Sequence, residues 1–305
     1  MSFFRMPFFV LIASLSAMAT SAFAEIVADE EMHRGKYEHF LTRAMLNGKG
    51  PFTVLIDTGS NETILMDAAL DALDIPASAG RSVNAHGAAG NMDLKYYKLE
   101  EIALGGLTAK APRVLGARGG LEDLVKEGVA VVIGIDIIGD YIVEFDQTAG
   151  RFRLHSSDSD MSEETDGWLS AEIKPGLAGL SFTTVSLNGA EMPALFDTGA
   201  SRTIINLAAA EAAGYTHGDP RLSPGEKPVR GFGGEPAPSM TATGAKISWG
   251  GLNLEGQSVT ISQASAFDLL RMSEGPGMIA GAPLFGDRDF VVDYEKGTVF
   301  IGPKR

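Results

Sequence analysis

The sequence predicts an all-β protein with a few short helices, built as two similar lobes that an approximate twofold axis relates. Asp-Thr-Gly occurs twice, at residues 57–59 and 197–199, so the two copies lie 140 residues apart. The stretch before each copy is repeated as well, and so is a longer block near the end of each half. Repeats on this scale indicate two copies of one structural unit.

Each Asp-Thr-Gly ends a predicted β-hairpin. "FLTRAMLNGKGPFTVLIDTGSNETIL" in the first half matches "FTTVSLNGAEMPALFDTGASRTII" in the second. Both stretches hold an Asn-Gly pair between apolar strands, at residues 47–48 and 188–189, which is a strong signal for a tight hairpin turn. The stretches that follow, residues 66–75 and 206–215, are rich in Ala and Leu and predict short helices.

A second repeated block closes each half, at residues 131–154 and 278–301. Its matched positions are Gly134, Gly139, Asp140 and Asp146 in the first half and Gly281, Gly286, Asp287 and Asp293 in the second. Gly-rich turns and alternating strands fill the stretch between the two repeats of each half. We therefore expect each lobe to be a small β-structure closed by this block.

The two halves meet at an acidic stretch, "SSDSDMSEETDG", which has no apolar periodicity and predicts an exposed linker. A calcium loop is the alternative, but the stretch lacks the third ligand and the glycine that such a loop requires. The predicted organisation is an N-terminal lobe over residues 25–155, a linker over 156–170 and a C-terminal lobe over 171–305.

Residues 1–24 predict a signal peptide. Arg5 supplies the positive start, an apolar run follows, and Ala22-Phe23-Ala24 fits a cleavage site. We expect an exported protein, periplasmic or secreted, with no stable membrane association after the signal is removed. The chain has no cysteine, which excludes thiolate nucleophiles and cysteine metal sites. Its net charge of −14 disfavours nucleic-acid binding but tolerates a neutral or basic polypeptide.

Paired Asp-Thr-Gly loops predict a catalytic carboxyl dyad. One copy alone indicates only a turn, because Asp and Thr bond nearby backbone and Gly allows a left-handed conformation. A twofold axis would bring Asp57 and Asp197 together, and two adjacent carboxyls then share one proton. The ionised member can take a proton from water while the protonated member polarises a carbonyl group. Thr58 and Thr198 are expected to bond the two lobes together.

These residues resemble those of the aspartic proteases, in particular bacterial exported proteins of the retropepsin-like type with two lobes like pepsin. The resemblance rests on "LIDTGS", "LFDTGA" and two later elements, Ile137-Ile138-Gly139 and Leu284-Phe285-Gly286. It implies an acid-protease fold of two retropepsin-like β-barrel lobes, an endopeptidase activity on extended polypeptides, and no cofactor or metal. It also implies supporting residues: Gly59, Ser60, Gly199 and Ala200 in the catalytic loops, and Ile138, Gly139, Phe285 and Gly286 packed against them.

The same resemblance implies Gly-rich flaps over the substrate. Their candidate tips are "AHGAAGN" with His86, Gly87 and Gly90, and "GFGGE" with Gly231, Phe232 and Gly233. Two further segments, residues 117–128 and 264–275, occupy equivalent positions; they either frame the substrate or form peripheral helices. Ser60 follows the first loop's glycine and Ala200 the second's, so the Ser60 hydroxyl is expected to bond Asp57 and make it the more acidic partner.

Other functions are disfavoured by the sequence. The five histidines have no metal-ligand spacing, and no Gly-x-Ser-x-Gly motif marks a serine hydrolase. A catalytically silent periplasmic relative that binds peptides with the same lobes is the alternative function. Pairing of lobes between two chains is unnecessary when both copies lie in one chain, so we expect a monomer.

Overall fold

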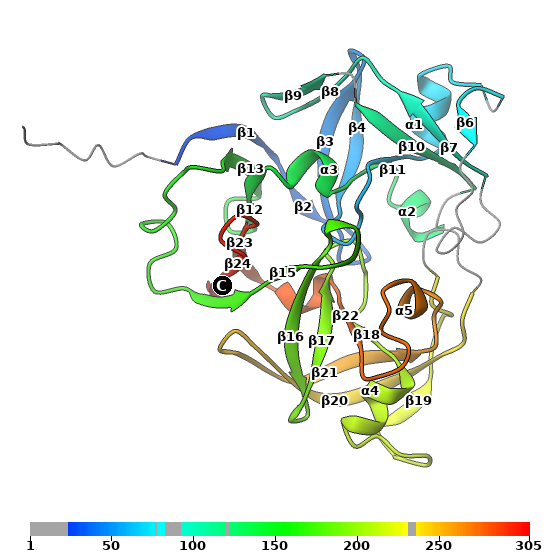
Figure 1. The fold of residues 1–305 in the computed structure, drawn as a ribbon, viewed down its shortest axis with the longest axis vertical. Helices are drawn as coiled ribbons and strands as arrows, with labels where there is room; N and C mark the ends of the chain where they lie inside the picture. Colours follow the sequence, from blue (N-terminus) through cyan, green and yellow to red (C-terminus); the bar gives the residue numbers. More distant parts are fainter. Residues whose placement is uncertain (1–23, 77, 83–92, 111, 120–121, 231–235) are drawn as a thin grey trace, which may run out of the picture.

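A computed structural model describes residues 24–76, 78–82, 93–110, 112–119, 122–230 and 236–305 (Figure 1). All but the last residue of the predicted signal peptide lie outside this set. The flap candidates His86, Gly87, Gly90, Gly231, Phe232 and Gly233 also lie outside it. The described part contains three β-sheets, one for each half and one that both halves share.

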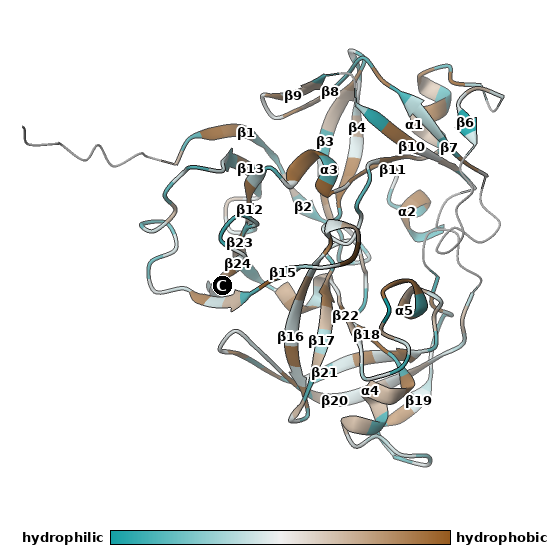
Figure 2. Ribbon diagram, viewed as in Figure 1, coloured by the Kyte–Doolittle hydropathy of each residue, from teal (hydrophilic) through white to brown (hydrophobic). Residues whose placement is uncertain are grey.

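The N-terminal half forms the upper sheet of Figure 1. Its strands are β2 (His33–Arg34), β3 (Phe40–Leu46), β4 (Lys49–Ile56), β5 (Ile64–Leu65), β6 (Arg81–Ser82), β7 (Asp93–Lys98), β8 (Glu101–Leu104), β9 (Leu107–Lys110), β10 (Arg113–Arg118) and β11 (Val129–Ile133). Their order is β6-β7-β10-β5-β11-β4-β3-β8-β9, with β2 paired to β3. All five residues of β11 are buried, and Figure 2 colours β11 and the following helix as hydrophobic.

The C-terminal half forms the lower sheet, with the same central arrangement. Its strands are β15 (Lys174–Pro175), β16 (Ser181–Leu187), β17 (Ala190–Phe196), β18 (Ile204–Ile205), β19 (Leu222–Pro224), β20 (Ser239–Trp249), β21 (Leu252–Ser262) and β22 (Met278–Ala280). Their order is β15-β16-β17-β22-β18-β21-β20-β19. In both halves the second hairpin strand runs parallel to the strand of the closing block, β4 with β11 and β17 with β22.

The third sheet joins the two halves. It contains β1 (Ile26–Glu31), β12 (Tyr141–Asp146), β13 (Arg151–Ser156), β14 (Leu169–Glu172), β23 (Arg288–Asp293) and β24 (Thr298–Lys304). Its order is β1-β13-β12-β23-β24-β14, so the two closing blocks pair antiparallel through β12 and β23. The fold is thus mostly β and bilobal, as predicted, but the lobes share a sheet. The lobe boundaries themselves stay a prediction.

Aromatic rings connect the three sheets. Phe145 and Phe290 of the shared sheet stack with their centroids 4.3 Å apart, and Phe40 of β3 packs edge-on against Phe145 at 4.9 Å. On the other side Phe285 contacts both Phe290, at 4.9 Å, and Phe196 of β17, at 5.0 Å. Each such pair contributes about 0.5–1.5 kcal/mol beyond the buried area. The column therefore fixes the ends of both hairpins relative to each other.

The predicted hairpins and helices are confirmed. Asn47 and Gly48 have φ values of 47° and 72°, and Asn188 and Gly189 have 52° and 90°, so both residues of each turn lie in the left-handed region that a two-residue hairpin needs. The helical elements are α1 (Asp67–Ala72), α2 (Glu122–Lys126), α3 (Ile135–Ile138), α4 (Leu207–Ala212), α5 (Ala266–Leu269) and the 3-10 turns η1 (Leu177–Gly179) and η2 (Ala282–Phe285). No helix within the described ranges is long and apolar enough to cross a bilayer.

The acidic stretch between the halves is not uniformly exposed. Met161 is 2 % exposed and packs with Ile142 and Val291 of the shared sheet. Ser159 and Thr165 are buried too, and the Thr165 hydroxyl donates to the Met161 carbonyl at 2.7 Å. The expectation of an exposed linker is therefore wrong for these three positions, because the shared sheet leaves an apolar surface that the stretch covers.

Candidate active site

The two Asp-Thr-Gly loops begin at equivalent strand ends. The Asp57 amide donates to the Ile133 carbonyl at 3.0 Å, and the Asp197 amide donates to the Ala280 carbonyl at 3.1 Å. Each loop thus leaves its hairpin strand beside the buried strand of the closing block. The twofold relation inferred from the sequence brings the two loops face to face between the upper and lower sheets of Figure 1.

Reciprocal hydrogen bonds join the loops through their threonines. The Thr58 amide donates to Thr198 Oγ1 at 3.1 Å, and the Thr198 amide donates to Thr58 Oγ1 at 3.0 Å. Each hydroxyl then donates to a carbonyl of the opposite half, Thr58 to Phe196 at 3.0 Å and Thr198 to Ile56 at 2.8 Å. Both threonines are fully buried, so these bonds fix the loop separation without competition from water.

The glycines of the two loops bring the carboxyls together. A Cβ atom on Gly59 would lie 2.4 Å from the carboxyl carbon of Asp197, and one on Gly199 would lie 2.3 Å from that of Asp57. Any larger residue would push the opposite aspartate away. Each carboxyl therefore lies against the glycine of the opposite loop, so the arrangement holds the two acids beside each other.

Burial and the neighbouring carboxylate raise the pKa of Asp57 well above its ordinary value. Burial also raises the pKa of Asp197, but two backbone amides oppose the shift: Gly199 and Ala200 both donate to Asp197 Oδ1 at 2.9 Å. Asp57 accepts one such bond, from the Gly59 amide at 2.8 Å, and the Ser60 amide lowers its pKa only weakly. Asp197 is therefore the more acidic member, and Asp57 holds the shared proton.

This order of acidity reverses the sequence-based prediction. The Ser60 hydroxyl does not bond Asp57; it donates to the Glu62 carbonyl at 2.8 Å. The Ser60 amide donates to the Asp57 carbonyl at 3.3 Å and lowers the pKa of the Asp57 carboxyl only weakly, whereas the equivalent Ala200 amide donates to the Asp197 carboxylate at 2.9 Å. A one-residue difference in where the loop amides point decides which acid is better stabilised as an anion.

The closing blocks support both loops from behind. The Ile135 amide donates to the Ser60 carbonyl, and the Ala282 amide to the Ala200 carbonyl, both at 2.9 Å. Gly134 and Gly281 lie so close to the loop carbonyls that a Cβ atom would approach them to 2.7 Å and 2.4 Å. The predicted support residues lie slightly further along the same elements: Ile138 and Phe285 are buried in the core, and Gly139 and Gly286 end α3 and η2. The sequence did contain a signal for the contacts with the loop carbonyls, because Gly134 and Gly281 occupy matched positions of the repeated block.

Charged residues that sequence reasoning missed follow each catalytic loop along the chain. Glu62 accepts a hydrogen bond from the Tyr96 hydroxyl at 2.7 Å, and the Arg113 guanidinium lies 4.2 Å from the Tyr96 ring centroid. At the equivalent position in the second half, Arg202 donates to the carbonyls of Lys227 and Pro228, both at 3.4 Å. These contacts join the end of each catalytic loop to a distant segment, β7 in the first half and the stretch after β19 in the second, so they depend on non-local pairing.

A buried contact between His39 and Glu127 lies near Asp197. His39 Nδ1 is 2.5 Å from Glu127 Oε2, and both side chains are 4 % exposed. Glu127 also accepts the Tyr37 amide at 2.8 Å. When His39 is protonated, its charge lowers the pKa of Asp197 further. No group of three or more metal-ligating side chains occurs among the described residues.

Comparison with known families agrees with this geometry. A family model described as aspartyl protease matches the chain twice, over residues 42–137 and 183–281. The two matched segments together cover more than half of the chain, and each contains one Asp-Thr-Gly loop and its closing strand. No significant match was found among curated proteins.

Proposed function

The chain belongs to the aspartyl protease family, and we propose that it is an endopeptidase that hydrolyses extended polypeptides with a water molecule activated between Asp57 and Asp197. The observation that carries the proposal is the close approach of these two carboxyls across the interface, each against the glycine of the opposite loop, with pKa values that are both raised. Such a pair retains one proton over a wide pH range, which acid–base hydrolysis requires.

The two acids take different parts in this mechanism. Asp197, the better stabilised anion, accepts a proton from the water molecule. The oxygen of this water bonds to the scissile carbonyl carbon in the same step. Asp57, which holds the proton, donates it to the carbonyl oxygen, giving a neutral tetrahedral diol. The C–N bond then breaks as Asp197 returns its proton to the nitrogen and Asp57 recovers a proton from a diol hydroxyl. Atoms and charges balance with water as the sole co-substrate.

The supporting residues keep this geometry fixed. The threonine bonds set the separation of the loops, and the glycines leave room for the carboxyls to meet. Preorganised groups of this kind lower the barrier because they need not reorganise during the reaction. The proposed substrate is a neutral or basic polypeptide, in keeping with the net charge of −14, and the proposed setting is the periplasm or the exterior of the cell, with the protein as a monomer.

The test is cleavage of denatured casein by the purified protein between pH 3 and pH 8. We expect Asp57→Asn and Asp197→Asn each to lower the rate by roughly three orders of magnitude or more. Both carboxyls act in the same step, so the loss of either one removes most of the catalysis. Asp74→Asn is the matched control: Asp74 is exposed, pairs with Lys49 at 2.9 Å, and should leave the rate unchanged. A statine-type transition-state mimic should inhibit the wild type.

Two outcomes would reject the proposal. Cleavage that survives both dyad substitutions would assign the activity to another site or a contaminant. A folded protein that binds peptides tightly but cleaves none at any pH would instead support the silent binding relative, and thermal unfolding of each variant would show that the fold is intact.

A further inference from the structure

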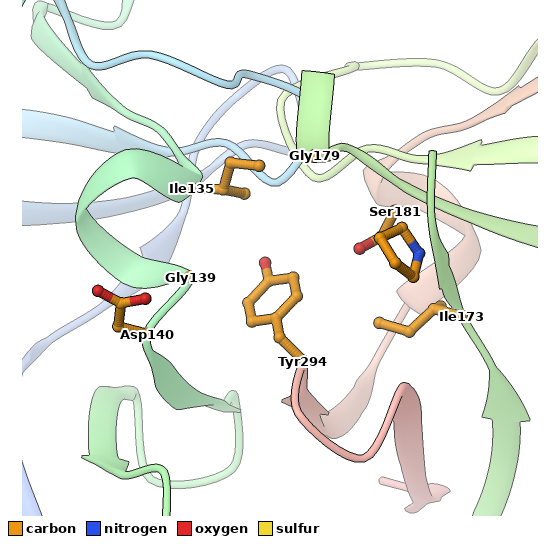
Figure 3. Close-up of a pocket in the computed structure, with 8 residues that line it drawn as sticks. Ile135, Gly139, Asp140, Ile173, Gly179, Ser181 and Tyr294 are labelled. Carbon is orange, nitrogen blue, oxygen red and sulfur yellow. The ribbon is translucent and has the colours of Figure 1, made fainter. Parts of the chain in front are cut away.

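A cavity of about 250 Å³ lies at the junction of the two halves and the shared sheet. Figure 3 shows it between the helical turn that carries Ile135, the segment with Ile173, and the turn with Tyr294. Its lining residues are Ile135, Gly139, Asp140, Ile173, Pro175, Gly179, Ser181 and Tyr294. None of these takes part in the hydrogen bonds of the dyad.

The Tyr294 hydroxyl is the unusual group in this cavity. Tyr294 is partly exposed as a residue, but its hydroxyl oxygen is buried and has no hydrogen-bond partner in the described structure. Figure 3 shows it pointing into the cavity toward Ile135. Burial, with the negative charge of the nearby dyad, raises the pKa of Tyr294, so the hydroxyl stays protonated and can donate. A buried hydroxyl without a partner is costly, and an acceptor in the cavity would remove that cost.

The rest of the lining defines the kind of acceptor that fits. Ile135, Ile173 and Pro175 provide apolar walls, while Ser181 is 5 % exposed and turns its hydroxyl into the same space (Figure 3). An apolar cavity of about 150 Å³ can hold benzene, so this larger one has room for a ring with one polar substituent. Anions are disfavoured because Asp140 lies in the lining and the negative charge of the dyad acts on Tyr294.

We propose that this cavity is a binding site for a small uncharged molecule, a six-membered ring or an alkyl group of that size, whose hydroxyl or carbonyl oxygen accepts a hydrogen bond from Tyr294. The site is distinct from the carboxyl dyad but is linked to it. The Ile135 amide in its wall donates to the Ser60 carbonyl of the catalytic loop at 2.9 Å. The inference does not depend on whether the protein cleaves peptides.

The test compares benzyl alcohol with toluene, which has the same ring and no oxygen, by calorimetric titration of the full protein. Tyr294→Phe should weaken benzyl alcohol binding about five- to tenfold and leave toluene binding unchanged, because one net hydrogen bond is lost. Benzoate should bind at least about tenfold more weakly than benzyl alcohol to the wild type, since it carries a charge into the cavity. In amide NMR spectra, benzyl alcohol should shift the Ile135 signal.

A second variant tests whether the ligands bind in this cavity or elsewhere on the protein. Ile173→Phe puts a larger side chain into the cavity and should abolish binding of both benzyl alcohol and toluene. The proposal fails if benzyl alcohol does not bind at millimolar concentration, if Tyr294→Phe weakens both ligands equally, or if Ile173→Phe still binds them. Tyr294→Phe removes a single oxygen, and thermal unfolding will show that it folds.

Discussion

The loops that start at Asp57 and Asp197 share one backbone plan but treat their carboxyls differently. Across the interface they are symmetric, since each threonine makes the same two bonds to the opposite half. Within each loop they are not: Asp197 accepts two backbone amides on one oxygen, and Asp57 accepts one. The symmetric bonds set the geometry, and the asymmetric ones decide where the proton resides.

The asymmetry continues where each loop meets its helix. Asn206 caps α4: its Oδ1 accepts from the Ala209 amide at 2.8 Å, and its Nδ2 donates to the carbonyls of Met272 and Gly275, both at 2.7 Å. The equivalent start of α1 is Met66, which makes no side-chain cap bond and packs into the core instead. The two halves thus share the hydrogen bonds that cross the interface but differ in the bonds that lie within a single half.

The largest expected effect tests the symmetric threonine hydrogen bonds between the two loops. Thr58→Val and Thr198→Val should each lower the free energy of unfolding by about 3 kcal/mol, because each leaves a buried amide and a buried carbonyl without a partner. The measurement is urea unfolding followed by circular dichroism. Thr42→Val is the control, since that buried threonine makes one bond, to the Glu31 carbonyl at 2.8 Å, and should cost about 1 kcal/mol. A cost at Thr58 no larger than at Thr42 would contradict the role given to the interface bonds.

Asn206→Ala should cost about 2 kcal/mol in the same unfolding experiment. Loss of the cap itself accounts for about 1 kcal/mol, and the carbonyls of Met272 and Gly275 lose their donor as well. Asn206→Ser separates these contributions, because serine can still cap α4 but cannot reach the two carbonyls. The serine variant should therefore lie between alanine and the wild type. Equal stability of Asn206→Ser and the wild type would show that the carbonyl bonds contribute nothing.

The pH dependence of stability tests the difference in acidity between Asp57 and Asp197. A carboxyl whose pKa is raised on folding stabilises the fold fully below its unfolded pKa of about 3.9, and this contribution is lost as the pH rises through the folded pKa. Asp57→Asn removes that loss, so at pH 7 it should be more stable than the wild type by on the order of 1 kcal/mol, with no gain near pH 3. Melting temperatures across this range provide the measurement.

Asp197→Asn is the internal comparison for this effect. It leaves Asp57 as the remaining acid, with a single amide donor, so its gain at pH 7 should be smaller than that of Asp57→Asn. A larger gain for Asp197→Asn would reverse the assignment of the shared proton.

The parts of the fold that the sequence predicted are those with local causes. The turns at Asn47-Gly48 and Asn188-Gly189 follow from residues that accept positive φ, and the short helices follow from their composition. The pairing of Asp57 with Asp197 followed from the repeat, since equivalent loops of two similar units meet on a twofold axis. The turns and helices needed only a few consecutive residues each, and the pairing of the aspartates needed only the comparison of the two repeats.

The unpredicted parts depend on pairing between distant segments. The shared sheet arises because β12 and β23 pair across the two halves, and nothing within either strand specifies that partner. The contact of Glu62 with Tyr96 and the cavity around Tyr294 have the same origin. The acidity of the dyad was mispredicted because a hydroxyl beside an acid can turn either way, and the direction Ser60 takes depends on the loop carbonyl that it meets.

The smallest expected effect tests whether the Ser60 hydroxyl bonds the Glu62 carbonyl or the Asp57 carboxyl. Ser60→Ala removes a partly exposed hydrogen bond to the Glu62 carbonyl and should lower stability by no more than about 0.5–1 kcal/mol. Because this hydroxyl does not bond the carboxyl, the loss should be the same at pH 3 and pH 7, where the charge of the dyad differs. Ala200→Ser, which adds the hydroxyl to the other loop, should give an equally flat difference. A loss for Ser60→Ala that grows with pH would mean that the hydroxyl stabilises the anion of Asp57, and the order of acidity in the dyad would return to the one that the sequence suggested.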